Sequence, residues 1–141
     1  MTNTIETISL AEARAVIDIC ERKAHDIKQP MNIAVVDAGG NLVAHVRMDN
    51  AWIGSIDISI SKAFTARCFD ISTEALGKES QPGKQFYGIH NSNHGRIMLF
   101  AGGYPLMKGD KVVGAVGVSG GSGEQDSAVA EAGKKFFEGK H

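Results

Sequence analysis

The sequence has almost no net charge. Fifteen Lys and Arg residues stand against sixteen Asp and Glu residues, which leaves a formal charge of −1 at pH 7. A protein that holds a nucleic-acid backbone or an anionic membrane surface needs a surplus of basic side chains. The sequence also has no apolar run as long as a membrane-spanning helix requires. We therefore expect neither a nucleic acid nor a membrane as a partner.

Cysteine is scarce as well. Cys20 and Cys68 have neither the spacing of a metal site nor that of a disulfide framework, and both fall in expected helices. Small buried thiols of this kind are typical of a reducing compartment. The first ten residues lack a basic segment followed by an apolar stretch, so no signal peptide is expected. The protein is therefore predicted to be cytoplasmic.

What is present indicates one domain. The chain has 141 residues, of which 43% are hydrophobic and 22% charged, and this composition supports a single core over residues 1–141. Because only 6% of the residues are aromatic, that core must consist mainly of Ala, Val, Ile and Leu. Glycine is frequent, with 17 residues, which indicates positions where the backbone turns sharply or approaches a neighbour closely.

Local patterns predict helices that alternate with β-hairpins. Ser9 and Glu12 match a capping box that begins a helix, and this helix must end before Pro30. Ser122 and Gln125 match a second capping box, at the start of the last helix. The other expected elements are a hairpin of strands 32–36 and 42–48, a helix over 53–69 with Ile53, Ile56, Ile60 and Phe64 on one side, a strand over 97–100, and a hairpin of strands 104–107 and 111–119.

The order of these elements, α-ββ-α-βββ-α, predicts an α+β fold. We expect a single-layer antiparallel sheet of about five strands with helices packed against it. Residues 70–95 show little periodicity, and a loop of this length is usually a lid, a binding loop or an oligomer contact. Gly114 and Gly117 interrupt the last strand, which indicates that a helix or a ligand packs very close there.

Three motifs that resemble enzyme signatures lack the context that would support them. Residues 117–121 match G-x-S-x-G, but the chain lacks the alternating βα units of that hydrolase fold. Residues 59–62 match S-x-x-K without the S-D-N and K-T-G motifs that accompany it. The glycine-rich stretch 120–123 has no sequence feature of a nucleotide site. None of the three predicts a function.

The five histidines do not form a metal motif. The sequence contains no H-E-x-x-H, no C-x-x-C and no C-x-x-C-H, so neither a classical zinc site nor a covalently attached haem is indicated. His25 lies towards the polar side of the first helix, and His45 lies in a strand with Val43 and Arg47 on the same face. No motif identifies a metal ligand among them.

Charged residues occur at two positions where they need partners. Arg47 and Asp49 close the second strand, and Lys62 interrupts a mostly apolar helix. One interpretation is an internal salt bridge that joins Asp37 or Asp49 to Lys62 or Arg47. The other is a polar rim that holds a carboxylate ligand, for which a bidentate arginine is well suited. The spacing alone does not separate the two.

The motifs occur in an ordered set that resembles the GlcG/HbpS family and the C-terminal domain of PduO-type corrinoid adenosyltransferases. They cover residues 9–135 and are Ala34–Val43, Arg47–Asp49, Ser61–Ala66, Gly102–Pro105, and Gly114–Gly121 with Gln125 and Asp126. The resemblance implies a five-stranded antiparallel sheet with helices, a homo-oligomer, and haem as ligand, with haem degradation in some relatives. The signature positions that it carries over include Asp37, Arg47, Asp49, Lys62, Ser119, Gly120 and Asp126.

The resemblance and the residues together favour a haem- or tetrapyrrole-binding protein. Such a ligand needs an apolar slot, an imidazole or soft donor, and a cationic group for each propionate. The chain has strand faces of Val and Gly for the slot and His and Met side chains as donors. The candidate haem-binding residues are Arg47, Lys62, His25, His45, Ser119 and Gly120.

The alternative is an enzyme for a small oxygenated carboxylate or aldehyde, of the kind found in glycolate, glycerol or diol metabolism. Lys62 with Asp37 or Asp49 would then supply acid–base catalysis, and Arg47 would hold the carboxylate. A third possibility is an accessory subunit of a metabolic enzyme, with the apolar faces used for assembly.

Overall fold

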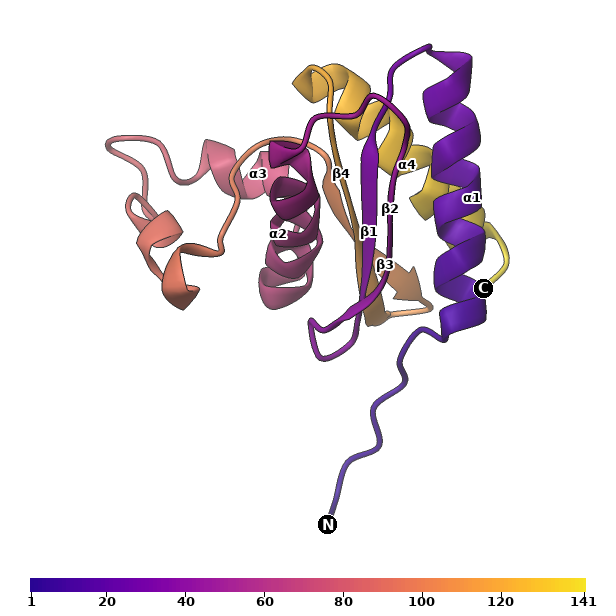
Figure 1. Ribbon diagram of the computed structural model, residues 1–141. Coiled ribbons are helices and arrows are strands. Elements are labelled where there is room, and N and C mark those ends of the chain that lie inside the picture. Colours follow the sequence, from indigo (N-terminus) through magenta and orange to yellow (C-terminus); the bar gives the residue numbers. More distant parts are fainter.

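The computed structural model describes all 141 residues and shows one antiparallel sheet between two layers of helices (Figure 1). Four strands pair in the order β2-β1-β4-β3. They are β1 (Asn32–Asp37), β2 (Leu42–Arg47), β3 (Gly103–Lys108) and β4 (Lys111–Ser119). Helices α1 (Leu10–Asp26) and α4 (Gly123–Gly139) cover one face, and α2 (Gly54–Phe69) covers part of the other. The predicted α+β fold is confirmed, with four strands in place of about five.

Both predicted capping boxes are present. The Ser9 hydroxyl accepts from the Glu12 N–H, and the Glu12 carboxylate accepts from the Ser9 N–H, so the first turn of α1 satisfies two of its free donors. Ser122 and Gln125 form the same reciprocal pair at the start of α4. These local contacts explain why the two helices begin where the sequence predicts.

The main core lies between the sheet and the pair α1 and α4. Alternate residues of the central strands face it, and Ile33 of β1 lies opposite Val118 of β4. Val16 and Cys20 from α1 and Val129 from α4 complete it, all fully buried. None of the helices combines the length and the hydropathy that crossing a bilayer requires.

The opposite face of the sheet packs on α2 through small residues. Ala34, Val36 and Ala115 from the strands meet Ala63 and Ala66 from the helix. A Cβ atom on Gly117 would overlap the Ser59 carbonyl oxygen of α2, so the close neighbour expected at that strand glycine is a helix. The side of α2 that carries Ile53, Ile56, Ile60 and Phe64 is not its buried side, and Ile53 is 76% exposed.

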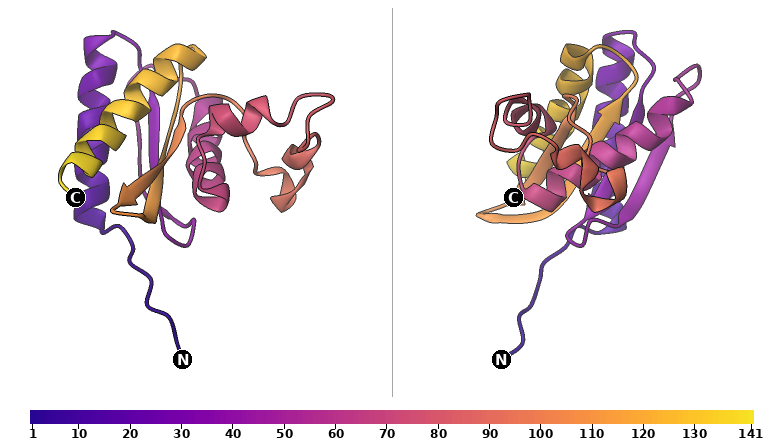
Figure 2. Two further views of the ribbon diagram at one scale, coloured as in Figure 1. Left: turned by 180° about the vertical axis from the view of Figure 1, so that it is seen from behind. Right: turned by 90° about the vertical axis from the view of Figure 1, so that its left-hand side faces the viewer.

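Two expectations for residues 70–100 are wrong. The strand expected over residues 97–100 does not form, because this segment binds α2 and pairs with no strand: the Met98 N–H donates to the Thr65 hydroxyl at 2.9 Å. The supposed loop 70–95 contains the short helix α3 (Thr73–Lys78) and two 3₁₀ turns, η1 (Ile89–Asn91) and η2 (Asn93–Gly95). Figure 2 shows the part beyond α3 projecting away from the sheet.

Candidate functional site

Three of the predicted site residues meet in one open groove. The groove has a volume of about 600 Å³ and lies between the end of α1 and the end of β2. His25, Arg47 and Asp49 all line it, together with Lys28 and Met48. The His25 side chain is 67% exposed and lies 3.6 Å from the Glu21 carboxylate. Polar and charged residues outnumber apolar ones in the lining of this groove, and Ala24, Val46 and Met48 supply its apolar surface.

His45 lies on a different surface, on the side of β2 that faces α2. It pairs in register with Ala34 of β1, and Ala34 belongs to the small cluster under α2. Strand alternation places Arg47 on the same side as His45. Val43, which was expected on that side too, lies at the irregularity in the β1–β2 pairing and packs against the core under α1 and α4. Arg47 thus stands at the end of β2 between this surface and the polar groove.

The imidazole of His45 is chemically unusual because its Nε2 atom is buried without a hydrogen-bond partner. Burial also lowers the pKa of His45 below its ordinary value. The neutral ring is therefore favoured. A neutral imidazole can ligate a metal ion through an unpartnered nitrogen, but here the side chains that cover Nε2 must first move aside. No group of three or more His, Cys, Asp or Glu side chains converges to hold a metal, at His45 or anywhere else in the chain. A haem iron needs only one or two protein ligands.

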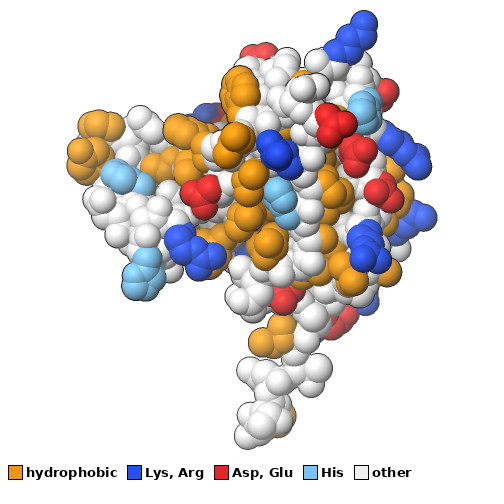
Figure 3. Space-filling view, viewed as in Figure 1, with side chains coloured by type: hydrophobic (Ala, Val, Ile, Leu, Met, Phe, Trp, Pro, Cys, Tyr) orange, Lys and Arg blue, Asp and Glu red, His pale blue; other side chains and the backbone are white.

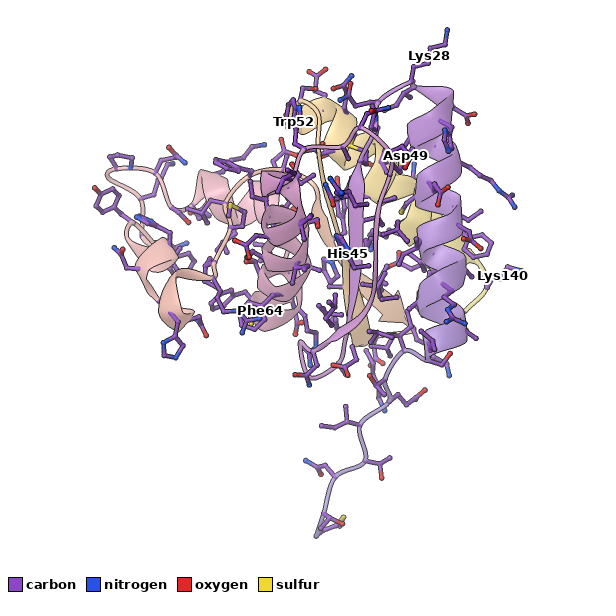
Figure 4. All side chains as sticks on the ribbon, viewed as in Figure 1. Lys28, His45, Asp49, Trp52, Phe64 and Lys140 are labelled. Atoms are coloured by element: carbon purple, nitrogen blue, oxygen red, sulfur yellow. The ribbon has the colours of Figure 1, made fainter.

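Apolar side chains of α2 lie on the same side of the sheet as this histidine. Ile60 packs against the cluster that contains Ala34, and Phe64 lies against Gly40 in the turn between β1 and β2. Figure 4 shows His45 on β2 beside α2, and Figure 3, seen from the same side, shows hydrophobic side chains gathered on this face. We call this surface, made by the α2-facing side of β2 and the adjoining side of α2, the His45 face.

Lys62 is remote from both surfaces. It is 1% exposed, and its Nζ donates to the Val118 carbonyl at 2.8 Å and to the Asp126 carboxylate at 2.9 Å. Burial lowers the pKa of Lys62 and raises that of Asp126, while their mutual attraction opposes both shifts. The ion partner of Lys62 is Asp126, and the structure brings Lys62 to neither Asp37 nor Asp49.

The remaining predicted residues have structural contacts. The Asp37 carboxylate accepts from the N–H groups of Gly39 and Asn41 and so closes the β1–β2 turn. The Ser119 hydroxyl donates to Ser55 at 3.0 Å, and the Gly120 carbonyl accepts from the Gln29 side chain. The polar groups of Asp37, Ser119 and Gly120 are thus engaged in hydrogen bonds within the chain.

Sequence reasoning did not assign Asp126 to Lys62. Asp126 is 64 positions further along the chain, and no spacing rule connects the two. One sequence feature did indicate that Asp126 makes a structural contact: it lies three residues after the turn Gly120–Gly123, in the first turn of a helix. Acidic residues in that position often bind backbone N–H groups. Here the second oxygen of Asp126 accepts from the Gly121 N–H at 2.9 Å.

The chain belongs to the HbpS-like family. The family model described as "Haem degrading protein HbpS-like" matches residues 8–135, which confirms the resemblance read from the ordered motifs. Among curated proteins, the chain is 46% identical over 127 residues to an uncharacterised 15.0 kDa protein from the dhaT-dhaS intergenic region of Citrobacter freundii. That match covers 90% of this chain and 89% of the relative.

Two solved structures have the same fold. The Klebsiella pneumoniae protein ORFY superposes with a TM-score of 0.94 at 39% identity, covering 96% of this chain and 94% of that one. A crystal structure described as a PduOC:heme complex superposes with a TM-score of 0.87 at 30% identity, covering 91% and 93%. The class of protein is thus that of the HbpS-like domains, one of which has been crystallised with haem.

Proposed function

We propose that this protein binds haem at the His45 face, with the His45 imidazole as an iron ligand. The observation that carries the proposal is the buried Nε2 atom of His45, which has no hydrogen-bond partner within the chain. Leaving a buried polar atom unpaired costs about 1–3 kcal/mol, and a ligand bond to iron would remove that cost. The similarity to a structure described as a haem complex supports the same ligand.

Two features on the same side of the sheet as His45 support the proposal. Apolar side chains of α2, among them Ile60 and Phe64, offer contacts for a flat macrocycle. The exposed Arg47, on the same side of β2, supplies a guanidinium for a propionate. When bound, haem supplies an iron centre with redox chemistry. The protein's own part is to hold a neutral imidazole and to shield it from water.

The enzyme alternative receives less support from the geometry. It requires Lys62 to reach a substrate, whereas Lys62 is 1% exposed and its amine is paired with Asp126. A buried lysine in an ion pair of this kind has a structural role. Of the functions considered, binding of haem therefore has the stronger physical basis.

A hemin titration of wild-type protein and two matched variants tests the site. We expect His45→Ala to lower the hemin affinity at least tenfold, by the loss of about 1.4 kcal/mol or more, and to change the ligand signature in magnetic circular dichroism. His25→Ala, in the polar groove, is the control and should bind as the wild type does. If His25→Ala loses binding and His45→Ala keeps it, the site lies in the polar groove. If wild-type binding never saturates, the proposed function is wrong.

The same complex tests the activity named in the family description. Ascorbate is added to the hemin complex under air, and the Soret band is followed. Decay of the band with a new biliverdin-type absorbance identifies a haem-degrading enzyme. A stable band identifies a binding protein.

A further inference from the structure

The side chain of Asn32, at the start of β1, is fully buried and uses only half of its amide. Its Nδ2 atom donates to the Trp52 carbonyl at 3.0 Å, just before α2 begins. Because a carbonyl oxygen can only accept, this bond fixes which end of the amide faces Trp52. The Oδ1 atom is therefore the free end, and it is buried without a donor.

Strand pairing places two side chains directly beside Asn32 on the α2-facing side of the sheet. They are Ser119 of β4 and Arg47 of β2, and directly opposed residues of antiparallel strands have Cβ atoms about 5 Å apart. The Ser119 hydroxyl already bonds to the Ser55 hydroxyl at 3.0 Å, and both serines are enclosed. Arg47 is the remaining donor beside the amide.

The Arg47 side chain has donors to spare. It is exposed at the end of β2, and it forms no ion pair with a carboxylate of the chain. A guanidinium carries several N–H donors on a long flexible stem, so it can reach an acceptor across the strand pair, whereas the enclosed serines cannot turn. Free donors on Arg47 thus stand next to a free acceptor on Asn32.

A carboxylate on a ligand makes this contact more favourable. Holding the free Arg47 side chain against Asn32 costs rotamer entropy and removes water from the guanidinium. A carboxylate that binds two N–H groups of the guanidinium orders the same side chain and leaves other N–H groups available. One of these can then bond to the Asn32 Oδ1 atom with little further loss of freedom.

We propose that Asn32 is a positioning residue for Arg47: when Arg47 binds a ligand carboxylate, the Asn32 Oδ1 atom accepts from the guanidinium and holds it at the end of β2. The inference rests on the proposed function, in which the carboxylate is a haem propionate. His45 lies on the same side of β2, and Figure 4 shows it together with Trp52 at the start of α2. Asn32 thereby favours ligands that carry a carboxylate within reach of this strand end.

Titrations with hemin and with hemin dimethyl ester, whose esterified propionates carry no charge, test the inference. We expect the wild type to prefer hemin by about tenfold, the value of one charge-assisted contact. Asn32→Leu and Arg47→Met should each remove most of this preference, and the double variant should remove no more than either alone, because the two residues act together. Ser55→Ala, which removes another buried polar contact at the start of α2, is the matched control and should keep the full preference.

The outcomes separate this inference from the proposed function. A purely structural role of Asn32 would weaken hemin and its ester equally, so an unchanged preference in Asn32→Leu, with binding that still depends on His45, overturns the positioning role and leaves haem binding intact. A wild type that binds neither porphyrin saturably rejects the proposed function, and the positioning role with it.

Nuclear magnetic resonance of the wild type provides a readout that needs no Asn32 variant to fold. In the diamagnetic ferrous carbon monoxide complex, the guanidinium N–H signals of Arg47 are assigned by their loss in Arg47→Met. We expect at least one of them to exchange slowly with water, because it is bonded to a buried acceptor. Rapid exchange of all Arg47 signals in the complex contradicts the proposal.

Discussion

At the scale of single residues, the Lys62–Asp126 pair joins three parts of the fold. Lys62 comes from α2, its amine also binds the Val118 carbonyl near the end of β4, and Asp126 lies in the first turn of α4. Both side chains are buried. A charge in this position is tolerated only while its partner and its hydrogen bonds are present.

Removal of one member of the pair should be strongly destabilising. We expect Asp126→Ala to lower the free energy of unfolding by about 3–5 kcal/mol, because Lys62 is left buried without its counter-ion. The double replacement Lys62→Met/Asp126→Leu should cost less than the single change, since no isolated charge remains. Urea denaturation of the three proteins measures this. A single-variant loss below about 1 kcal/mol would mean that the pair is not shielded from water.

The His45 imidazole should make stability depend on pH. Burial lowers the pKa of His45 in the folded chain below the ordinary value of about 6.5. Between the two pKa values the unfolded chain binds a proton that the folded chain does not, so stability falls as the pH decreases through this window. His45→Gln removes that proton uptake. We expect unfolding free energies at pH 7 and pH 5 to differ less in His45→Gln than in the wild type, and an unchanged difference would contradict a buried neutral ring.

At the scale of elements, α2 packs through backbone and small side chains instead of large apolar ones. Gly117 of β4 lies directly under the Ser59 carbonyl. Ser55 and Ser59 on the buried side of α2 are fully enclosed, whereas Ile53 faces outward. The helix and the sheet therefore approach more closely than Leu or Ile side chains would allow.

A methyl group at this contact should be destabilising. Gly117→Ala forces α2 away from β4 and is expected to cost about 1–3 kcal/mol. Gly54→Ala, at the start of the same helix with no atom near the new Cβ, is the matched control and should change stability by less than about 0.5 kcal/mol. Thermal unfolding of both variants gives the comparison. Equal stabilities would show that the helix moves aside without strain.

The elements that sequence predicts well are those with local causes. The capping boxes at Ser9 and Ser122 and the Gly39-Gly40 turn act within a few residues, and they place α1, α4 and the first hairpin correctly. The side on which α2 is buried could not be predicted, because its isoleucines define an apolar stripe that faces outward. The strand expected over residues 97–100 failed because its backbone binds Thr65, a distant hydroxyl.

The sequence identified candidate site residues, but it could not tell which of them share a surface. His25, Arg47 and Asp49 do meet in one groove, but His45 lies on the other side of β2. Which side a strand residue faces follows from register, and the β1–β2 pairing contains an irregularity near Val35 that no sequence rule locates. The importance of His45 comes from an unpaired nitrogen, which only coordinates reveal.

At the scale of the whole molecule, residues 82–95 and the rest of the chain are held together by different contacts. The layered part of the fold is held by the buried cluster between the sheet and the helices α1 and α4. Residues 82–95 are held by hydrogen bonds between near neighbours in the sequence.

Since residues 82–95 share no hydrogen bond with the sheet, this segment can change in length without disturbing the layers behind it. Variation of this kind would leave the rest of the fold recognisable.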